Sequence, residues 1–391
     1  MEQLLHYCWK HKMFPLGALH TTDGQPVEVI DAGLHNRNAG PDFFNAKVKI
    51  GGELWVGNVE IHDKSTDWFL HGHERDDHYN NVVLHVAGVI DAEVRTASGL
   101  RPPQMQLDVP ETVRRNYEEL LKADNYPPCY KIVPTLSRIR VHSWMSALET
   151  ERLERKTDDI ARRAACCQSS WEAAYFVTMA RNYGFGINGD AMEQWAMNVP
   201  LGAVGHHRDD LFQVEALFLG QAGLLDPLSI PERHRQAALA DPYYQRMASE
   251  YKYLAHKFGL QPIDHHLWRF LRLRPQNFPH IRISQLARLY FLRKAGLSQL
   301  IDCEDVKSAQ QMLATSPTDY WQTHYAFGCE SARSEKRLSA ASVNLLLINT
   351  VVPMLFAYGR HKRDERLCDR AFAFLDQLRA EDNHIVRMWK A

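Results

Sequence analysis

The spacing of hydrophobic and polar residues changes along the chain and divides it into two parts. Between residues 27 and 94, short apolar runs alternate with polar residues, as is typical of half-buried β-strands. Residues 46–50 alternate cleanly, Gly51-Gly52 is a two-residue hairpin signal, and residues 58–62 alternate again. The pattern therefore predicts a β-hairpin in this region, followed by a buried strand over 81–86.

Helical patterns surround this β-rich region. A short apolar and aromatic helix is expected over 4–14 and another over 111–122. Beyond Pro127-Pro128 strand signals nearly vanish, and a long charged helix over about 138–165 leads into further helical segments. We therefore expect an α+β protein, in which a small N-terminal α/β sheet domain (1–110) precedes a larger all-α domain (111–391).

Composition narrows the class of protein. Hydrophobic residues make up 45% and charged residues 24%, as in an ordinary globular chain. The longest apolar stretch, near 343–348, is interrupted by Asn349 and Pro353, so no membrane span is expected. The first residues lack the apolar core of a secretory signal, and the seven cysteines have no regular spacing. These features favour a cytoplasmic protein without a disulfide framework.

Charge is distributed unevenly although the net charge is −1. Residues 1–115 contain 11 Lys and Arg against 16 Asp and Glu, whereas the remaining residues contain 35 against 31. An acidic part joined to a mildly basic part suggests that the first holds cations and the second meets an anionic partner.

Two carboxylates occupy the predicted hairpin in a way that suggests metal chemistry. Asp42 precedes the first strand, and Glu60 lies on the partner strand with His62 on the same face. If strand pairing brings Asp42 and Glu60 together, they would bind Mg²⁺ or Mn²⁺, which prefer oxygen ligands. Such an ion would activate water for phosphodiester hydrolysis, with His62 as a ligand or water-orienting group. The alternative is a turn at Asp42 and a solvent-facing Glu60.

This layout resembles the PD-(D/E)XK nuclease superfamily. Pro41-Asp42 matches the first part of its motif, and Glu60-Ile61-His62 matches the second part, with histidine in place of lysine. The resemblance implies that Asp42 and Glu60 are metal ligands and that His62 stands in for the catalytic lysine. A histidine is mostly neutral at pH 7, so Lys64, or a lysine on the partner strand, would have to supply the missing charge.

A second group of polar residues follows the hairpin closely. It contains histidines and carboxylates that would form either a separate Zn²⁺ site or the outer shell of the first site: His71, His73, Asp76, Asp77 and His85. The alternative is a loop in which the histidines cap a helix or pair with the neighbouring aspartates.

The later part of the chain contains a basic, aromatic stretch. Residues 265–300 have no Asp or Glu, and they interleave arginines with aromatic residues, as nucleic-acid channels do. The arginines considered for contact with DNA or RNA are Arg269, Arg272, Arg274 and Arg282. The alternative is a structured turn in which the arginines pair with carboxylates.

Longer runs along the whole chain, such as GPDFFNAKVKI and INTVVPMLFAYG, resemble an uncharacterised family of bacterial proteins. That resemblance implies the two-part architecture and no activity. Three functions therefore stay open: a metal-dependent nuclease, a non-catalytic nucleic-acid-binding or scaffold protein on a degenerate nuclease fold, and a His-rich metallohydrolase for a small molecule.

Overall fold

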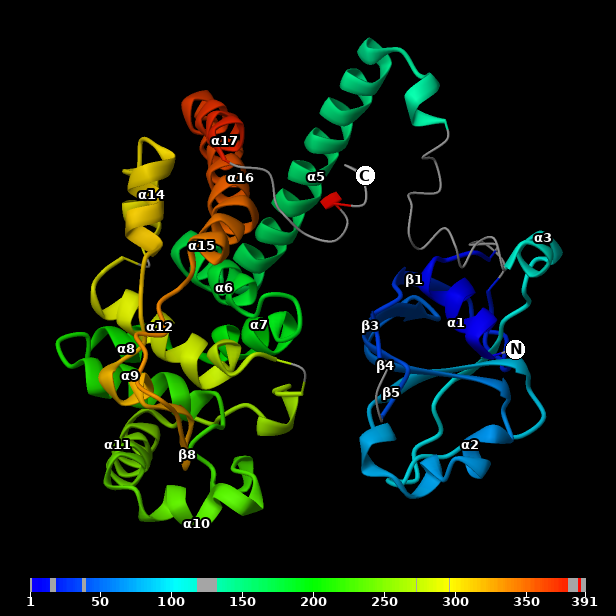
Figure 1. Ribbon diagram of the computed structural model, residues 1–391, viewed down its shortest axis with the longest axis horizontal. Coiled ribbons are helices and arrows are strands. Elements are labelled where there is room, and N and C mark those ends of the chain that lie inside the picture. The colour runs from blue at the N-terminus through cyan, green and yellow to red at the C-terminus, as the bar shows by residue number, and fades with distance from the viewer. Residues whose placement is uncertain are drawn as a thin grey trace. The chain divides into compact units, whose positions relative to one another are not determined.

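The chain folds into two compact units, seen in a computed structural model (Figure 1). The described residues are 2–14, 19–36, 40–117, 132–271, 273–294, 296–378 and 386–387. The N-terminal unit comprises Met1–Thr135 with His384–Ala391, and the helical unit comprises Leu136–Asn383. An N-terminal sheet unit followed by a helical unit confirms the predicted α+β class.

The N-terminal unit is built on a six-stranded mixed sheet with the order β1-β3-β4-β5-β6, in which β2 also pairs with β3. Strands β1, β3 and β4 are antiparallel, whereas β4, β5 and β6 run parallel. The elements are α1 (Glu2–Lys10), β1 (Val27–Asp31), β2 (Leu34–His35), β3 (Phe43–Ile50), β4 (Glu53–Lys64), α2 (Asp67–Leu70), η1 (His73–Arg75), η2 (Asp77–Tyr79), β5 (Val82–Val89), β6 (Gln104–Gln106) and α3 (Glu111–Arg115).

The predicted hairpin is formed by β3 and β4. Gly51 and Gly52 both have positive φ, 60° and 91°, which glycine adopts without strain, and they let the strands turn back on each other. The register pairs Phe43 with Val59, so the residues on either side of this pair, Asp42 and Glu60, become neighbours.

The core of the N-terminal unit lies between α1 and the sheet. Trp9, Phe43 and Ile61 are fully buried there, and the Trp9 indole donates to the Ala32 carbonyl (3.0 Å). Val113 of α3 also belongs to this core. Helix α3 is therefore part of the N-terminal unit, although a boundary at residue 110 leaves it out.

The helical unit packs its helices around one large apolar core. Its helices are α5 (Arg138–Cys166), α6 (Trp171–Tyr183), α7 (Gly189–Asn198), α8 (Leu201–Gly205), α9 (Leu211–Gln221), α10 (Glu232–Ala240), α11 (Pro242–Phe258), α12 (Pro279–Phe291), α13 (Leu297–Ile301), α14 (Val306–Leu313), α15 (Ala340–Leu346), α16 (Val352–Lys362) and α17 (Glu365–Gln377). Short 3₁₀ segments connect them: η3 (Val133–Thr135) before α5, then η4 (Pro227–Ser229), η5 (His265–Leu267), η6 (Pro275–Asn277) and η7 (Asp319–Gln322).

The expectation of an all-α second part needs one correction. Strands β7 (His324–Ala326) and β8 (Cys329–Glu330) form a small antiparallel hairpin. The strands are too short to produce an alternating pattern in the sequence.

A π-helical turn, Leu347–Val351, joins α15 to α16. Pro353 lacks an N–H, so it cannot bond to the carbonyl of Asn349 four residues earlier. The Asn182 side chain donates to that carbonyl instead (3.0 Å) and also to the Thr350 hydroxyl (2.9 Å). The whole helix Ala340–Lys362 has the length and composition of a membrane span, but 56% of its most apolar window is buried inside the protein, as in a core helix.

Candidate metal centre

Strand pairing brings Asp42 and Glu60 together, and each carboxylate accepts a hydrogen bond from the backbone of the opposite segment. The Asp42 N–H donates to Glu60 Oε2 (3.0 Å), and the Ile61 N–H donates to Asp42 Oδ2 (2.9 Å). One oxygen of each carboxylate is therefore engaged by backbone. The juxtaposition expected from the hairpin is present, while Glu60 Oε1 faces the opposite way, toward histidines.

Helix α1 adds His6 to this pair. His6 Nε2 lies 3.2 Å from Asp42 Oδ2. Burial disfavours the charged imidazole, but the hydrogen bond and charge of Asp42 outweigh it and raise the pKa of His6. Burial and the neighbouring Asp42 charge raise the pKa of Glu60 to about 9.

Three imidazoles converge beside Glu60. One ring nitrogen from each of His62, His71 and His73 lies within 4.8 Å of the other two. His62 Nε2 is 3.2 Å from His71 Nδ1, and Glu60 Oε1 is 3.5 Å from His62 Nε2 and 3.1 Å from His73 Nε2. The three imidazole nitrogens thus converge, and the Glu60 oxygen lies beside two of them, those of His62 and His73.

His73 is the clearest sign of a ligand site. Its side chain is only 9% exposed, and its Nε2 is buried without an aligned hydrogen-bond partner, despite lying 3.1 Å from Glu60 Oε1. The ring is held by stacking on Tyr79 (3.8 Å between centroids) and by the edge of Trp68. A buried nitrogen in this position loses hydration without compensation unless another group, such as a metal ion, meets it. Tyr79 and Trp68 are themselves buried core residues.

Gln104 and His85 form a hydrogen-bonded series that fixes the orientation of His62 on the side of its Nδ1 atom. Gln104 Nε2 donates to the Ala92 carbonyl (3.0 Å), which sets the amide orientation, and lies 3.2 Å from His85 Nδ1. His85 Nδ1 therefore accepts, and its Nε2–H donates to His62 Nδ1 (2.9 Å). In the neutral state the hydrogen of His62 therefore sits on Nε2, the nitrogen that faces His71 Nδ1 (3.2 Å).

Burial depresses the basicity of this chain. The pKa of His62 falls to about 2 because of burial and the neighbouring imidazoles, and burial lowers the pKa of His85 to about 4. Burial also lowers the pKa of His73. These shifts keep the imidazoles of His62, His73 and His85 neutral, and a neutral imidazole is the form that binds metals.

Three other residues expected at this site, Asp76, Asp77 and Lys64, do not join the group of converging imidazoles. Asp76 accepts from the His78 backbone (3.0 Å) and imidazole (2.7 Å), and Asp77 accepts from the Asn80 amide (3.0 Å). Both aspartates therefore stabilise the local 3₁₀ turns. Lys64 is exposed at the end of β4, where its backbone N–H donates to Asp67 (3.0 Å).

The arginines expected to contact nucleic acid occupy different environments. Arg274 is exposed, and Arg269 is half-buried, where burial lowers its pKa. Arg282 is only 6% exposed, and its guanidinium bonds to Gln285 and Asn277, so it is an interior residue and not available to a nucleic acid. Arg272 lies outside the described residues.

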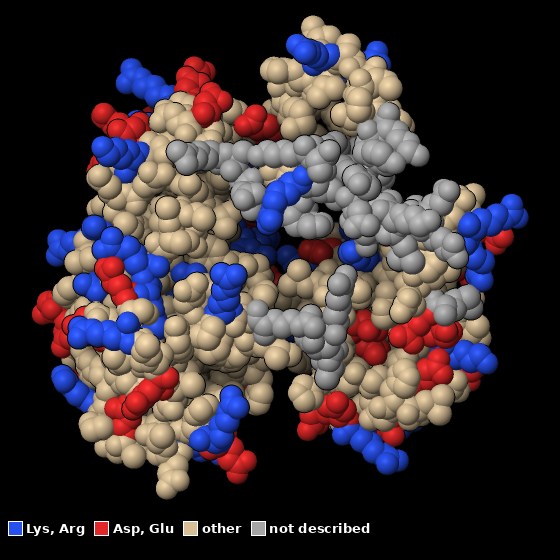
Figure 2. Space-filling model, in the orientation of Figure 1, with Lys and Arg blue, Asp and Glu red and all other residues tan. Residues whose placement is uncertain are grey.

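Figure 2 shows acidic side chains gathered on the visible face of the N-terminal unit, in keeping with its excess of Asp and Glu. Such a field favours the approach of cations.

Two residues that complete the site were not found from the sequence. Gln104 lies on β6 and reaches His85 only through parallel strand pairing, which no local pattern reveals. His6 is a single histidine in an apolar helical segment, which by itself predicts a core position.

The donor set indicates which ions fit. Three imidazole nitrogens and one carboxylate suit Zn²⁺ or Mn²⁺, whereas Mg²⁺ prefers oxygen ligands alone. A second set of close donors among the described residues, Asp264, His265 and His266, is consecutive in sequence and largely exposed. Asp264 caps the η5 turn there (2.9 Å to the His266 N–H).

Comparison with known proteins places the chain in a family. Neither the curated proteins nor the solved structures contain a match to it, and the resemblance to PD-(D/E)XK nucleases is not confirmed by any comparison. A family model described as a protein of unknown function matches residues 2–384, nearly the whole length. The chain therefore belongs to the family DUF2851.

Proposed function

We propose that this protein is a metal-dependent hydrolase with its centre at Glu60, His62, His71 and His73, and that its substrate is a phosphodiester of DNA or RNA. The observation that carries the proposal is the convergence of three imidazole nitrogens beside Glu60 Oε1, with the buried His73 Nε2 lacking a hydrogen-bond partner.

The hairpin supports the choice of a phosphodiester substrate. Asp42 lies just before β3 and beside Glu60 of β4, and this pair follows helix α1 and precedes α2 and β5. The PD-(D/E)XK resemblance implies this order: a helix, a hairpin bearing the two acids, a helix and a further strand. In the helical unit, Arg274 is an exposed cation suited to a phosphate backbone. Arg282 is buried, so the basic stretch 265–300 offers fewer arginines to a nucleic acid than the sequence pattern suggests.

The side chains have distinct roles in the proposed reaction. His62 Nε2, His71 Nδ1 and His73 Nε2 would hold a Zn²⁺ or Mn²⁺ ion with Glu60 Oε1. Such an ion lowers the pKa of water and stabilises negative charge on the reacting phosphate. Asp42 positions Glu60 through the backbone, and His85 and Gln104 orient His62. His71 is the exposed member, so substrate would approach from its side.

Hydrolysis assays with a matched pair of histidine variants test this proposal. The metal-loaded chain is incubated with single-stranded and double-stranded DNA, RNA and bis(p-nitrophenyl) phosphate. His71→Ala removes an exposed ligand with little effect on folding, and His78→Ala removes an exposed histidine whose ion pair, among the residues the structure describes, is with Asp76. We expect activity in wild type and His78→Ala, and its loss in His71→Ala. Equal activity in all three proteins, or none with either ion, would refute the proposal.

A small-molecule metallohydrolase is the second candidate, and burial is the observation that favours it. Among the four ligand residues only His71 is exposed, whereas Glu60, His62 and His73 are buried. A site this enclosed suits a compact substrate. Cleavage of bis(p-nitrophenyl) phosphate without cleavage of any nucleic acid would favour this second candidate.

A further inference from the structure

A pocket in the helical unit lies outside the metal centre. It has a volume of about 760 Å³ and is formed where the start of α11 faces the β7–β8 hairpin. Its lining residues are Ala237, Ala240, Asp241, Pro242, Tyr243, Tyr320, His324, Gly328 and Glu330. No lysine or arginine is among these nine, so the charged side chains of the lining are both carboxylates.

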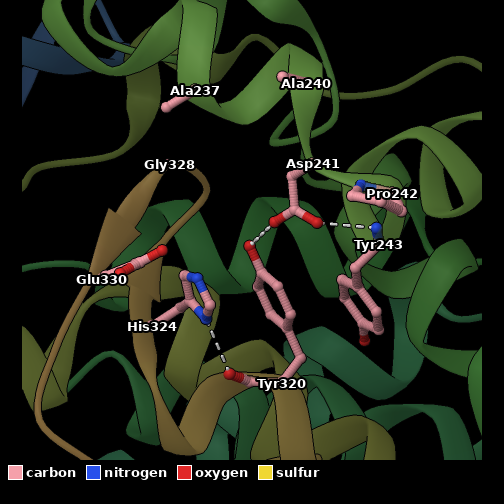
Figure 3. A pocket seen from close by; sticks show the side chains of 9 residues that line it. All are labelled: Ala237, Ala240, Asp241, Pro242, Tyr243, Tyr320, His324, Gly328 and Glu330. Atoms are coloured by element: carbon pink, nitrogen blue, oxygen red, sulfur yellow. Dashed lines mark hydrogen bonds between the residues drawn. The ribbon is translucent and has the colours of Figure 1, made fainter.

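Three parallel rings form one wall. Tyr320 stacks on Tyr243 with 4.0 Å between centroids and an angle of 7°, and His324 stacks on the other face of Tyr320 at 4.1 Å and 3°. Figure 3 shows His324 and Tyr320 side by side, with the Glu330 carboxylate extending toward them from β8. The stack leaves the orientation of the imidazole little freedom.

The wall rests on a buried carboxylate. Glu215 of α9 is only 1% exposed, and it accepts hydrogen bonds from the Tyr243 hydroxyl (2.7 Å), the Thr318 hydroxyl (2.9 Å) and the Trp321 indole (2.9 Å). These bonds tie α9, α11 and η7 together beneath the pocket. The lining side chains are therefore preorganised, which lowers the entropy cost of binding.

The hydrogen-bonding groups at the pocket are acceptors. His324 Nδ1 lies 3.2 Å from the Tyr320 carbonyl, which can only accept, and 3.0 Å from the Thr323 hydroxyl, which donates to that same carbonyl (3.2 Å). Nδ1 therefore carries the hydrogen, and Nε2 presents a lone pair. Asp241 accepts from the Tyr243 N–H (2.8 Å) and from the Tyr320 hydroxyl (2.5 Å), and each oxygen has a further lone pair. The Glu330 carboxylate makes neither a hydrogen bond nor an ion pair with another described residue.

From this geometry we infer that the pocket binds an organic cation with N–H donors, of the alkylammonium or alkylguanidinium type. The cation would donate to Glu330, Asp241 and His324 Nε2, and its alkyl part would lie against Ala237, Ala240 and the Tyr243 ring. An anion would meet two carboxylates and no lysine or arginine among the lining residues, which disfavours this class of ligand.

Isothermal titration calorimetry on the full-length chain tests the inference. Three probes with a four-carbon chain distinguish the effect of charge from that of hydrogen-bond donors. Putrescine carries ammonium groups, and agmatine carries a guanidinium and an ammonium group. The third probe, 1,4-butanediol, has hydroxyl donors without charge. We expect saturable binding of at least one of the two cations and none of the diol. Absence of binding by both cations, or equal binding of the diol, would overturn the inference.

Two variants locate the binding. Glu330→Gln removes the charge of an exposed side chain at the pocket, and Glu335→Gln removes an exposed charge nearby in sequence that pairs with Arg337. We expect Glu330→Gln to weaken cation binding at least tenfold and Glu335→Gln to leave it unchanged. Binding by Glu330→Gln at the wild-type affinity would overturn the inference.

Discussion

The buried histidines of the N-terminal unit predict that the metal-free protein loses local stability in mild acid. In the unfolded chain these groups titrate near pH 6.5, whereas the folded environment lowers the pKa of His85 to about 4 and that of His62 to about 2. The unfolded state therefore binds more protons below pH 6.5. The associated stability is fully present above that pH and is lost as the pH falls toward the folded pKa values.

The size of the effect follows from the two shifts. Lowering the pH from 6.5 to 5 crosses roughly 1.5 units in which the unfolded chain takes up a proton at each site and the folded chain does not. At about 1.4 kcal/mol per unit, each histidine contributes a loss of about 2 kcal/mol, and the pair contributes about 4 kcal/mol. Glu60 acts in the opposite direction, because its raised pKa lets the folded chain hold a proton that the unfolded chain lacks, and it offsets about 2 kcal/mol of that loss. The net loss is therefore about 2 kcal/mol. The value is an upper estimate, because partial opening of the site would admit protons earlier.

Hydrogen exchange measured by mass spectrometry is the suitable assay, because peptides from β4 and β5 report on the N-terminal unit alone. Opening free energies are compared at pH 7 and pH 5 with a chelator present. His85→Gln removes one titrating group and should abolish most of the net pH-dependent loss, while His78→Gln, at an exposed histidine, should not change it. An equal loss in wild type and His85→Gln would refute the reasoning.

Three further predictions address the second layer of the site and the helical unit. Gln104→Leu removes the group that orients His85, and we expect calorimetry to show Zn²⁺ affinity reduced roughly 10–100-fold; unchanged affinity would contradict the orienting role. Glu193 is held by Arg163 (3.0 Å), and its arginine neighbours outweigh burial and lower its pKa to about 2. Its contribution of about 3 kcal/mol is therefore present above pH 4.5 and lost as the pH falls toward 2, and urea denaturation of Glu193→Gln should lack this acid-dependent loss. Asn182→Ala leaves the Asn349 carbonyl without its donor and should lower the free energy of unfolding by about 1–3 kcal/mol, whereas a change below about 0.5 kcal/mol would contradict the account of the π-helical turn.

Local patterns predicted the hairpin and the neighbourhood of Asp42 and Glu60, because alternation and a Gly-Gly turn fix strand register within about twenty residues. The sequence suggested that His71 and His73 lie near Glu60 only because many histidines and carboxylates follow the hairpin closely. They lie in the segment after β4, whose return path depends on the packing of Trp68 and Tyr79.

Contacts between distant strands and helices could not be predicted in this way. Gln104 meets His85 through the β5–β6 pairing, and His6 meets Asp42 from a helix at the start of the chain. For Arg282, the local sequence pattern gave a wrong prediction. Its sequence neighbourhood is basic and aromatic, which is typical of a nucleic-acid surface, yet α12 buries it against Phe185.

The most direct test of the central claim is anomalous diffraction from crystals grown with Zn²⁺ or Mn²⁺. The convergence of His62, His71 and His73 beside Glu60 predicts one strong anomalous peak within about 2.5 Å of these side chains, at ordinary metal–ligand distances. A well-ordered site without such a peak at saturating metal, or a peak held by other residues alone, would contradict the account.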